Sequence, residues 1–290
     1  MGWPLQGEQR VTPDSRPQSA TMPSVKGTSL TLRVAALCAL FASHVCAQWI
    51  NYPNPGIPRT SDGKPDLKAA PPKLADGKTD LSGIWVRVPP PGNPGGANFG
   101  NTVTYYMPAG AEVPLQSWAA DLLHRRRYED LGGGRPSERC LPHGIIGAML
   151  PNTPFKIAHT PGVTFLLYEQ LNQYRQIFTD GRKFPEDPNP AWWGYSVGRW
   201  EGDRFVVETR GFNDKTWLDD SGYPHTEAMR SLEKFHRTSF GQMDLEVTID
   251  DPKAYTKPWS VQIPLRLMAD TEMIEDVCEN EKDAKHFTTK

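Results

Sequence analysis

The sequence has few cysteines, little net charge and no long apolar run, and each shortage excludes a class of protein. Its 290 residues include 32 basic and 34 acidic side chains, which gives a formal net charge of −2. Such a balance provides no bulk attraction to nucleic acid or to an anionic membrane, so neither partner is expected. The apolar run from Val34 to Ala42 is about half as long as a membrane-spanning helix needs, so no membrane span is expected in the mature chain.

Motifs of several enzyme classes are also missing. The sequence has no C-x-x-C pair, no P-loop and no dinucleotide fingerprint, since Gly132-Gly133-Gly134 follows a predicted helix instead of opening one. The stretch Gly194 to Gly198 places Ser196 in an apparent strand, without the sharp turn of a hydrolase nucleophile. Side chains that could bind a metal are His143, His159, His225 and Asp219. No two of these histidines have the close helical spacing of a zinc protease, so we predict neither a metal nor a cofactor.

An export signal is predicted within residues 1–47. Two basic residues precede the apolar run, and Val45-Cys46-Ala47 then fits the signal-peptidase site. Cleavage after Ala47 would give a mature chain that begins at Gln48, and residues 1–21 are interpreted as an upstream extension. Lipidation of Cys46 is the weaker alternative, because no small residue stands just before it. We therefore predict a periplasmic or secreted protein.

Cleavage would remove Cys38 and Cys46 and leave only Cys140 and Cys278. In an oxidising compartment, these two cysteines have one intramolecular pairing. On the chain-entropy estimate, a bridge that closes so long a loop stabilises the fold by about 4 to 5 kcal/mol. We predict this disulfide, and the alternative is two separate buried thiols.

The mature chain divides into an arm and one domain. Residues 48–79 are rich in proline, lysine and aspartate, show no hydrophobic period, and are interpreted as an extended arm or linker. Residues 80–290 are interpreted as a single β-rich domain. One helix is predicted between Pro114 and the three glycines at 132–134. Its apolar face would be formed by Leu115, Trp118 and Leu122, and its basic turn, residues 124–127, favours a solvated surface over an anion site.

Short runs of alternating polar and apolar residues predict nine or ten strands. Proline at 28 and glycine at 25 agree with short strands joined by turns. The clearest alternation is Met243, Leu245, Val247 and Ile249, which gives that strand one wet face. The predicted strands are 80–86, 155–159, 163–169, 174–179, 195–200, 204–209, 232–238, 243–250, 261–267 and 273–278. Mostly local connections predict an antiparallel meander, closed as a barrel or folded as a sandwich, with one or two short helices.

Four phrases carry a resemblance that covers Asp80 to about Asp283: DLSGIWV, PAWWGYSVGRWEGDRFVVETRGFND, LDDSGYPHTE and DVCENEKD. They resemble a large family of uncharacterised secreted bacterial proteins that carry the same phrases in the same order. That family has no established reaction, so it implies no catalytic residues. Gly83-Ile84-Trp85 is also similar to the Gly-x-Trp in the first strand of calycin barrels such as lipocalins, which implies a ligand cavity.

The loop from Trp217 to Glu227 concentrates acid–base side chains. Asp219 or Asp220 could orient His225 as a general acid or base, which would suit a hydratase, dehydratase or isomerase. The same residues could instead form a turn at 220–222 and cap a short helix near Thr226.

Eight aromatic residues lie between Trp192 and Tyr223, and such density either lines a cavity or fills a barrel core. The predicted ligand contacts are Trp193, Tyr195, Trp200, Trp217, Arg175 and Arg237. The two arginines could meet a ligand carboxylate or pair with glutamates across strands. The preferred function is a secreted β-barrel that binds a small hydrophobic or aromatic ligand in the cell envelope, and the alternative is the acid–base enzyme. The sequence predicts no oligomeric state.

Overall fold

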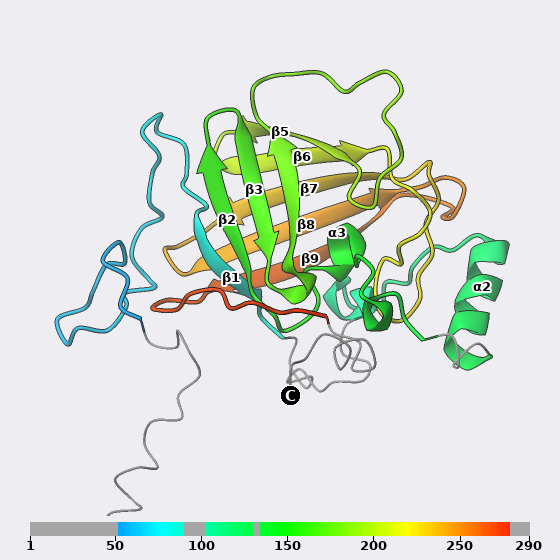
Figure 1. Cartoon of the computed structure of the whole chain (residues 1–290), viewed down its shortest axis with the longest axis horizontal. Helices are drawn as coiled ribbons and strands as arrows, with labels where there is room; N and C mark the ends of the chain where they lie inside the picture. Colours follow the sequence, from blue (N-terminus) through cyan, green and yellow to red (C-terminus); the bar gives the residue numbers. More distant parts are fainter. Residues whose placement is uncertain (1–51, 90–101, 130–133, 279–290) are drawn as a thin grey trace, which may run out of the picture. The chain divides into compact units, whose positions relative to one another are not determined.

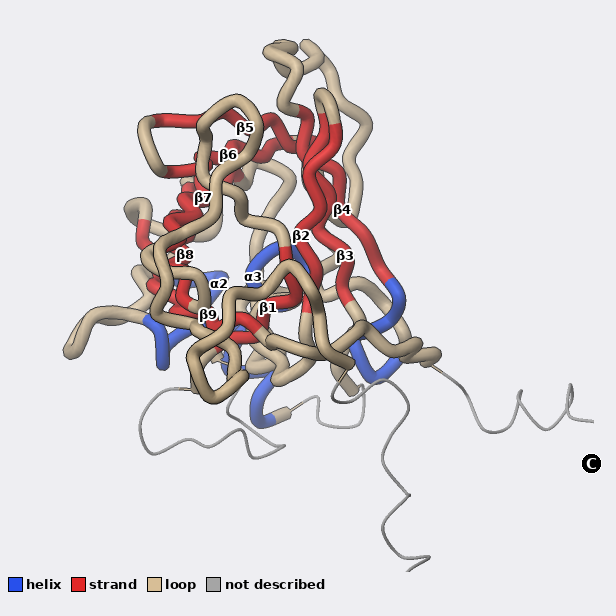
Figure 2. Tube along the Cα trace, turned by 90° about the vertical axis from the view of Figure 1, so that its left-hand side faces the viewer, coloured by secondary structure: helices blue, strands red, loops and turns tan. Residues whose placement is uncertain are grey.

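The computed structural model describes residues 52–89, 102–129 and 134–278. The predicted signal, the glycines at 132 and 133 and the end of the family phrase DVCENEKD lie outside these ranges. Within them, nine strands close into one barrel in chain order (Figures 1 and 2). The prediction of a mainly β fold is confirmed, in its barrel form.

The strands are β1 Gly83–Arg87, β2 Phe155–Thr160, β3 Val163–Tyr168, β4 Gln173–Phe178, β5 Tyr195–Glu201, β6 Arg204–Arg210, β7 Arg230–Arg237, β8 Gln242–Asp250 and β9 Trp259–Leu267. The helices are α2 Ser117–Tyr128 and α3 Gly144–Gly147, with short 3-10 turns η1 Val103–Tyr106, η2 Ser137–Arg139 and η3 Gln170–Asn172.

One pair of neighbouring strands departs from the antiparallel meander. Strands β4 and β5 run parallel, with Ile177 opposite Ser196, and a long connection joins them. An odd number of strands that strictly alternate in direction cannot close a ring, so a nine-stranded barrel needs such a pair. Strand β9 then meets β1 antiparallel, with Trp85 opposite Leu267.

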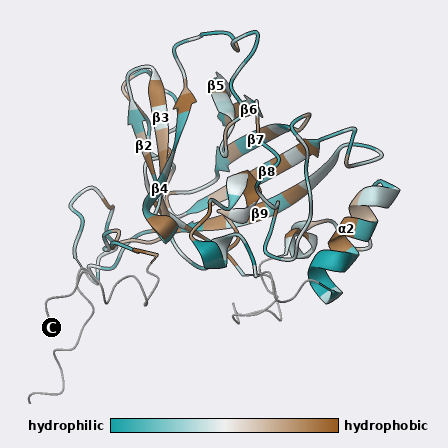
Figure 3. Ribbon diagram, turned by 45° about the vertical axis from the view of Figure 1, so that its right-hand side comes forward, coloured by the Kyte–Doolittle hydropathy of each residue, from teal (hydrophilic) through white to brown (hydrophobic). Residues whose placement is uncertain are grey.

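Alternation along the strands fills the barrel interior. In β8 every second residue from Met243 to Ile249 is buried, and β9 repeats this pattern from Trp259 to Leu267. Brown and teal bands alternate along these strands in Figure 3. Burial of apolar side chains at about 25 cal/mol per Å² therefore supplies the main stabilisation of the barrel.

The described part of the segment expected as an arm contains two short hairpins of similar sequence. RTSDGKPDL at 59–67 and KLADGKTDL at 73–81 each close with a β-bridge, Arg59 to Pro65 and Lys73 to Thr79. Gly63 and Gly77 take φ of 80° and 82°, which favours glycine at both turns. The repeated phrase is a sequence signal that composition alone does not reveal.

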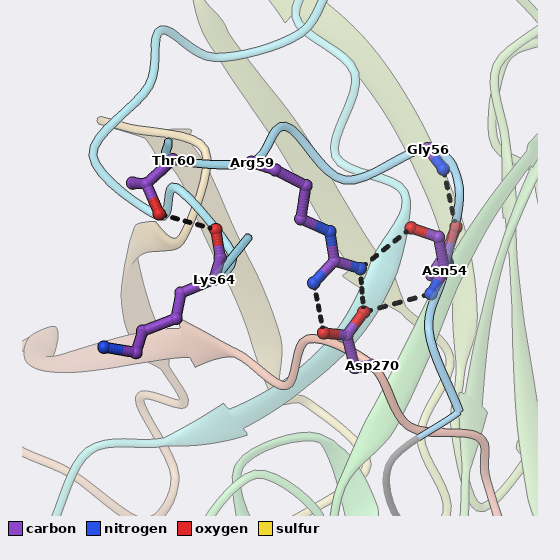
Figure 4. A network of polar contacts seen from close by, with 6 residues as sticks. All are labelled: Asn54, Gly56, Arg59, Thr60, Lys64 and Asp270. Carbon is purple, nitrogen blue, oxygen red and sulfur yellow. Dashed lines mark hydrogen bonds and ion pairs between the residues drawn. The ribbon is translucent and has the colours of Figure 1, made fainter. Parts of the chain in front are cut away.

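Contacts with the barrel fix the first hairpin. Arg59 Nη1 donates to Asp270 Oδ2 at 2.6 Å, and the backbone N–H of Asn54 donates to Asp270 Oδ1 at 3.0 Å (Figure 4). A Cβ added to Gly241 would lie 2.5 Å from Leu67 Cβ, so this leucine packs directly on the turn between β7 and β8. These contacts attach the segment to the barrel.

Helix α2 begins later and faces differently than predicted. It starts at Ser117, not at Pro114, and buries Ala119 and Leu123 while Trp118 is 44% exposed. The predicted apolar face through Leu115, Trp118 and Leu122 is therefore wrong. The reason is the next turn, where Arg126 and Arg127 pack on a barrel loop and set which face points inward.

The strand predicted at 273–278 is wrong as well. The backbone of this segment bonds to side chains instead of joining a neighbouring strand: Ile274 N donates to Glu169 Oε2, and Asp276 N donates to Asn172 Oδ1. The disulfide prediction is confirmed, since Cys140 and Cys278 are bonded with their Cα atoms 5.6 Å apart.

Candidate functional site

The loop from Trp217 to Tyr223 is held by two arginines of helix α2. Arg126 Nη1 donates to the carbonyl of Gly222 at 2.9 Å. Arg127 donates to both the carbonyl and the hydroxyl of Ser221, each at 2.9 Å. The acceptors are all neutral oxygens, so these bonds position the loop without neutralising the arginines.

The same guanidinium groups stack on aromatic rings. Arg126 Cζ lies 4.6 Å from the centroid of Trp217, and Arg127 Cζ lies 5.0 Å from that of Tyr223. Cation–π contacts of this kind are worth about 0.5 to 2 kcal/mol each, depending on desolvation. The pairs create a surface that is both aromatic and cationic.

This surface borders a cavity of about 420 Å³, which we call the α2 cavity. Small-molecule sites commonly occupy about 300 to 1,000 Å³. Its aromatic lining is Tyr105, Tyr128, Trp217 and Tyr223, and its charged lining is Arg126, Arg127, Arg135, Glu138 and Asp220. Hydroxyl groups come from Thr102, Thr104 and Ser221. The lining thus combines four aromatic rings with eight polar or charged side chains, and polar groups of this kind orient a ligand on an apolar surface.

Charge in the α2 cavity is unevenly compensated. Arg135 donates its backbone N–H to Glu138 Oε2 at 2.9 Å, and their side chains lie 3.9 Å apart. Among the described residues, no carboxylate forms an ion pair with Arg126 or Arg127. Burial lowers the pKa of Arg126 to about 10, which leaves it cationic at neutral pH.

Asp219 and Asp220 have different surroundings. Asp219 is buried, and its oxygens accept from Val103 N at 2.8 Å and from Ser221 N and Oγ at 2.9 and 2.7 Å. Burial raises the pKa of Asp219, and these bonds oppose the shift. Asp220 lines the α2 cavity, accepts from Ser137 Oγ at 3.1 Å and lies 3.8 Å from His143 Nδ1. Asp219 thus fixes the loop, while Asp220 faces the cavity.

His225 is engaged by threonines and not by these carboxylates. Its Nε2 lies 2.5 Å from Thr216 Oγ1, and its Nδ1 lies 3.3 Å from the carbonyl of Thr226. The ring is buried, and burial lowers the pKa of His225. The structure does not join His225 to Asp219 or Asp220, so no contact favours the acid–base interpretation.

The turn interpretation of this loop has direct support. Gly222 N donates to Asp219 O at 3.1 Å, which closes a turn at φ of 101° for Gly222. The helix expected near Thr226 is only one turn, closed by Met229 N on Thr226 O at 3.1 Å. Asp251, directly after β8, accepts from Thr226 N and Oγ1.

Arg175 lies inside the barrel in a fully compensated pair. It donates to both oxygens of Glu233 at 2.9 and 2.5 Å, and both side chains are at most 1% exposed. Its other donors reach Ser196 Oγ at 3.0 Å and Thr209 Oγ1 at 2.7 Å. Burial opposes the charge, but Glu233 raises the pKa of Arg175 above its ordinary value. Of the two predicted roles, cross-strand pairing is the contact present.

Arg237, at the last residue of β7, is satisfied by carbonyl groups. It donates to Asp80 O at 2.6 Å and to Phe240 O at 3.1 Å, and its Cζ lies 4.9 Å from the ring centroid of Trp85. Burial lowers the pKa of Arg237 to about 10. Its role is to join β7 to the start of β1.

The predicted ligand aromatics are dispersed around the barrel. Trp193 stacks on Tyr168 with centroids 4.9 Å apart, and Tyr195 stacks on Phe178 at 5.0 Å. Trp200 lines a separate cavity of about 360 Å³ beside the second hairpin. Of the six predicted ligand residues, only Trp217 lines the α2 cavity. Tyr195 and Trp200 point to opposite faces of β5, and Trp193 and Trp217 lie in loops outside the strands.

Sequence reasoning missed the contribution of helix α2. Arg126 and Arg127 belong to the basic turn that was expected to be solvated, and only His124 and Arg125 in that turn are exposed. A usable signal was the spacing of Ala119, Leu123 and Arg126 on one helical face.

The described residues contain neither a candidate metal cluster nor a candidate membrane-spanning helix. No group of three or more histidine, cysteine or carboxylate side chains among them is arranged to hold a metal ion. None of their helices has the length and apolar character needed to cross a bilayer. Comparison with known proteins found no matching family model, no matching curated protein and no matching solved structure.

Proposed function

We propose that this protein binds a small aromatic molecule in the α2 cavity, between helix α2 and the loop from Trp217 to Tyr223. The observation that carries the proposal is the lining itself, four aromatic rings with two arginines stacked on two of them. The barrel positions the loop, and Asp219 holds it through the N–H of Val103 and Ser221. The chemistry is recognition by a preformed aromatic surface.

The proposed setting is the periplasm or the cell exterior. The signal-like segment at 1–47 supports it, and so does the disulfide between Cys140 and Cys278. The resemblance to secreted bacterial proteins remains part of the proposal. The placement of Gly83-Ile84-Trp85 at the start of β1 in a closed barrel supports the calycin-like comparison.

Titration with the neutral dye N-phenyl-1-naphthylamine tests the binding proposal. The dye should bind one site per chain, and Tyr105→Ala should weaken binding about threefold or more through the loss of an aromatic contact. Tyr105 is 48% exposed, so its removal should leave the melting temperature nearly unchanged. Trp217→Ala should weaken binding about tenfold, with melting measured beside it.

Trp118→Phe is the matched control, because Trp118 is 44% exposed on the same helix and donates to Lys253 O instead of lining the cavity. Equal loss of binding in the Trp118 and Trp217 variants would contradict the proposed site. The absence of saturable dye binding in the parent protein would contradict the proposed function.

A further inference from the structure

We propose that the ligand of the α2 cavity carries one negative charge, as a carboxylate or sulfonate on an aromatic frame, and that Arg126 and Arg127 bind this group. The inference rests on the proposed function and adds the chemical class of the ligand. It starts from a contrast among the partly or fully buried arginines of this chain.

Buried charges in proteins are normally paired or fully hydrogen-bonded, because desolvation is costly. Arg175 satisfies this rule with Glu233, and Arg237 satisfies it with carbonyl oxygens of two segments, 80–82 and 239–240. In the described part of the chain, Arg126 donates to Gly222 O alone, and Arg127 donates to the two oxygens of Ser221 alone. The α2 cavity therefore holds two cations whose counter-charge the described residues do not provide.

The arrangement leaves donors for a ligand. With Nη1 of Arg126 on Gly222, its Nε and Nη2 donate to no acceptor in the described part of the chain. Arg127 donates through Nε and Nη2, so its Nη1 likewise donates to no acceptor among the described residues. Guanidinium groups match the planar oxygens of a carboxylate, and charge-assisted bonds of this kind are about twice as strong as neutral ones.

The other charged groups of the lining limit the ligand to a single charge. Glu138 is engaged by Arg135, and Asp220 accepts from Ser137 Oγ beside His143. Arg135 balances the charge of Glu138, whereas Asp220 is a further carboxylate of the lining and would repel a ligand with several negative charges. The rings of Trp217 and Tyr223 lie under the two guanidinium groups, so an aromatic frame can contact the wall while its anion meets the arginines.

A matched pair of dyes tests the inference. 8-Anilinonaphthalene-1-sulfonate is N-phenyl-1-naphthylamine with an added sulfonate, so the difference in affinity isolates the charge. The sulfonate dye should bind the parent protein about tenfold more tightly than the neutral dye, and Arg126→Gln should lower this ratio of affinities to about twofold or less, whatever its effect on both dyes in common. Arg125→Gln is the control, because it removes the same charge from an exposed position in the same turn.

The outcomes separate the two proposals. Equal affinity for the two dyes in the parent protein would overturn the inference while leaving aromatic binding intact, and this comparison needs no variant. Loss of the preference in both Arg125→Gln and Arg126→Gln would also overturn it, because bulk charge would then be the cause. A sulfonate preference that Arg126→Gln abolishes and Arg126→Lys partly restores supports it. If neither dye binds, the proposed function fails together with the inference.

Discussion

Arg175 inside the barrel and Arg126 beside it show two ways in which one fold treats a desolvated guanidinium. Arg175 is held by Glu233, Ser196 and Thr209, and its side chain is 1% exposed. Among the residues that the structure describes, Arg126 has one carbonyl acceptor and one aromatic ring as partners, and burial lowers the pKa of Arg126 to about 10. Complete pairing indicates a structural role, whereas an uncompensated charge at a cavity indicates a binding role.

Breaking the paired arginine should have one of the two largest effects on stability. Glu233→Gln removes the counter-charge of Arg175 and should lower the free energy of unfolding by about 3 to 5 kcal/mol. Urea denaturation measures this loss. The double variant Arg175→Met with Glu233→Leu should recover most of it, because an apolar pair needs no compensation. A loss below about 1 kcal/mol in Glu233→Gln would contradict the structural role.

Removing the disulfide should affect the wall of the α2 cavity as well as the stability of the fold. Cys140 follows η2, whose residue Glu138 lines the α2 cavity. Replacing Cys140 and Cys278 by serine should lower the free energy of unfolding by about 4 to 5 kcal/mol on the chain-entropy estimate and weaken dye binding. Intact mass of the exported protein checks both the bridge and the predicted start at Gln48. Two free thiols under denaturing, non-reducing conditions would contradict the bridge.

Buried histidines should make stability fall in mild acid. Burial lowers the pKa of His143, His159 and His225 below the ordinary value of about 6.5. The unfolded chain then binds more protons below pH 6.5, so their contribution is complete above that pH and declines as the pH falls. Asp219 and Glu169 act in the opposite direction, because burial raises the pKa of each.

The free energy of unfolding should therefore fall between pH 7 and pH 5, by up to about 1.4 kcal/mol per pH unit for each histidine. The melting temperature should fall with it, and a series of melts across this pH range measures the change. His225→Gln should flatten this profile and leave dye binding within twofold, because its ring contacts Thr216 and Thr226. A large loss of binding in His225→Gln with normal folding would favour the acid–base interpretation of this loop instead.

Replacing Arg126 should have the smallest effect on stability. Arg126→Gln removes one hydrogen bond and one stacking contact, worth about 1 kcal/mol, and also relieves a desolvated charge. Chemical denaturation of Arg126→Gln and Glu233→Gln side by side compares their losses of unfolding free energy. A loss as large as that of Glu233→Gln would show that Arg126 is a structural residue.

The barrel was predictable because local alternation determines which side chains are buried. The pattern Met243, Leu245, Val247 and Ile249 predicts the inner face of β8 without knowledge of any partner strand. The strand predicted at 273–278 does not form, because the backbone of this segment bonds to the Glu169 and Asn172 side chains, which lie about a hundred positions away in sequence. Local patterns carry no information on such partners.

The candidate site was predictable only in part. Trp217 and Asp220 were singled out from one loop, and both line the α2 cavity. Arg126 and Arg127 come from a helix that precedes this loop by more than 90 residues, and their stacking on Trp217 and Tyr223 depends on the tertiary fold. The pairing of Arg175 on β4 with Glu233 on β7 likewise depends on the tertiary fold, because β5 and β6 lie between these strands in the sheet.

A crystal structure of the protein with 8-anilinonaphthalene-1-sulfonate would locate the bound anion. We expect the naphthalene ring against Trp217 or Tyr223 in the α2 cavity, with a sulfonate oxygen within about 3 Å of a nitrogen of Arg126 or Arg127. Dye bound inside the barrel against Arg175 and Glu233, or in the cavity lined by Trp200, would contradict this expectation.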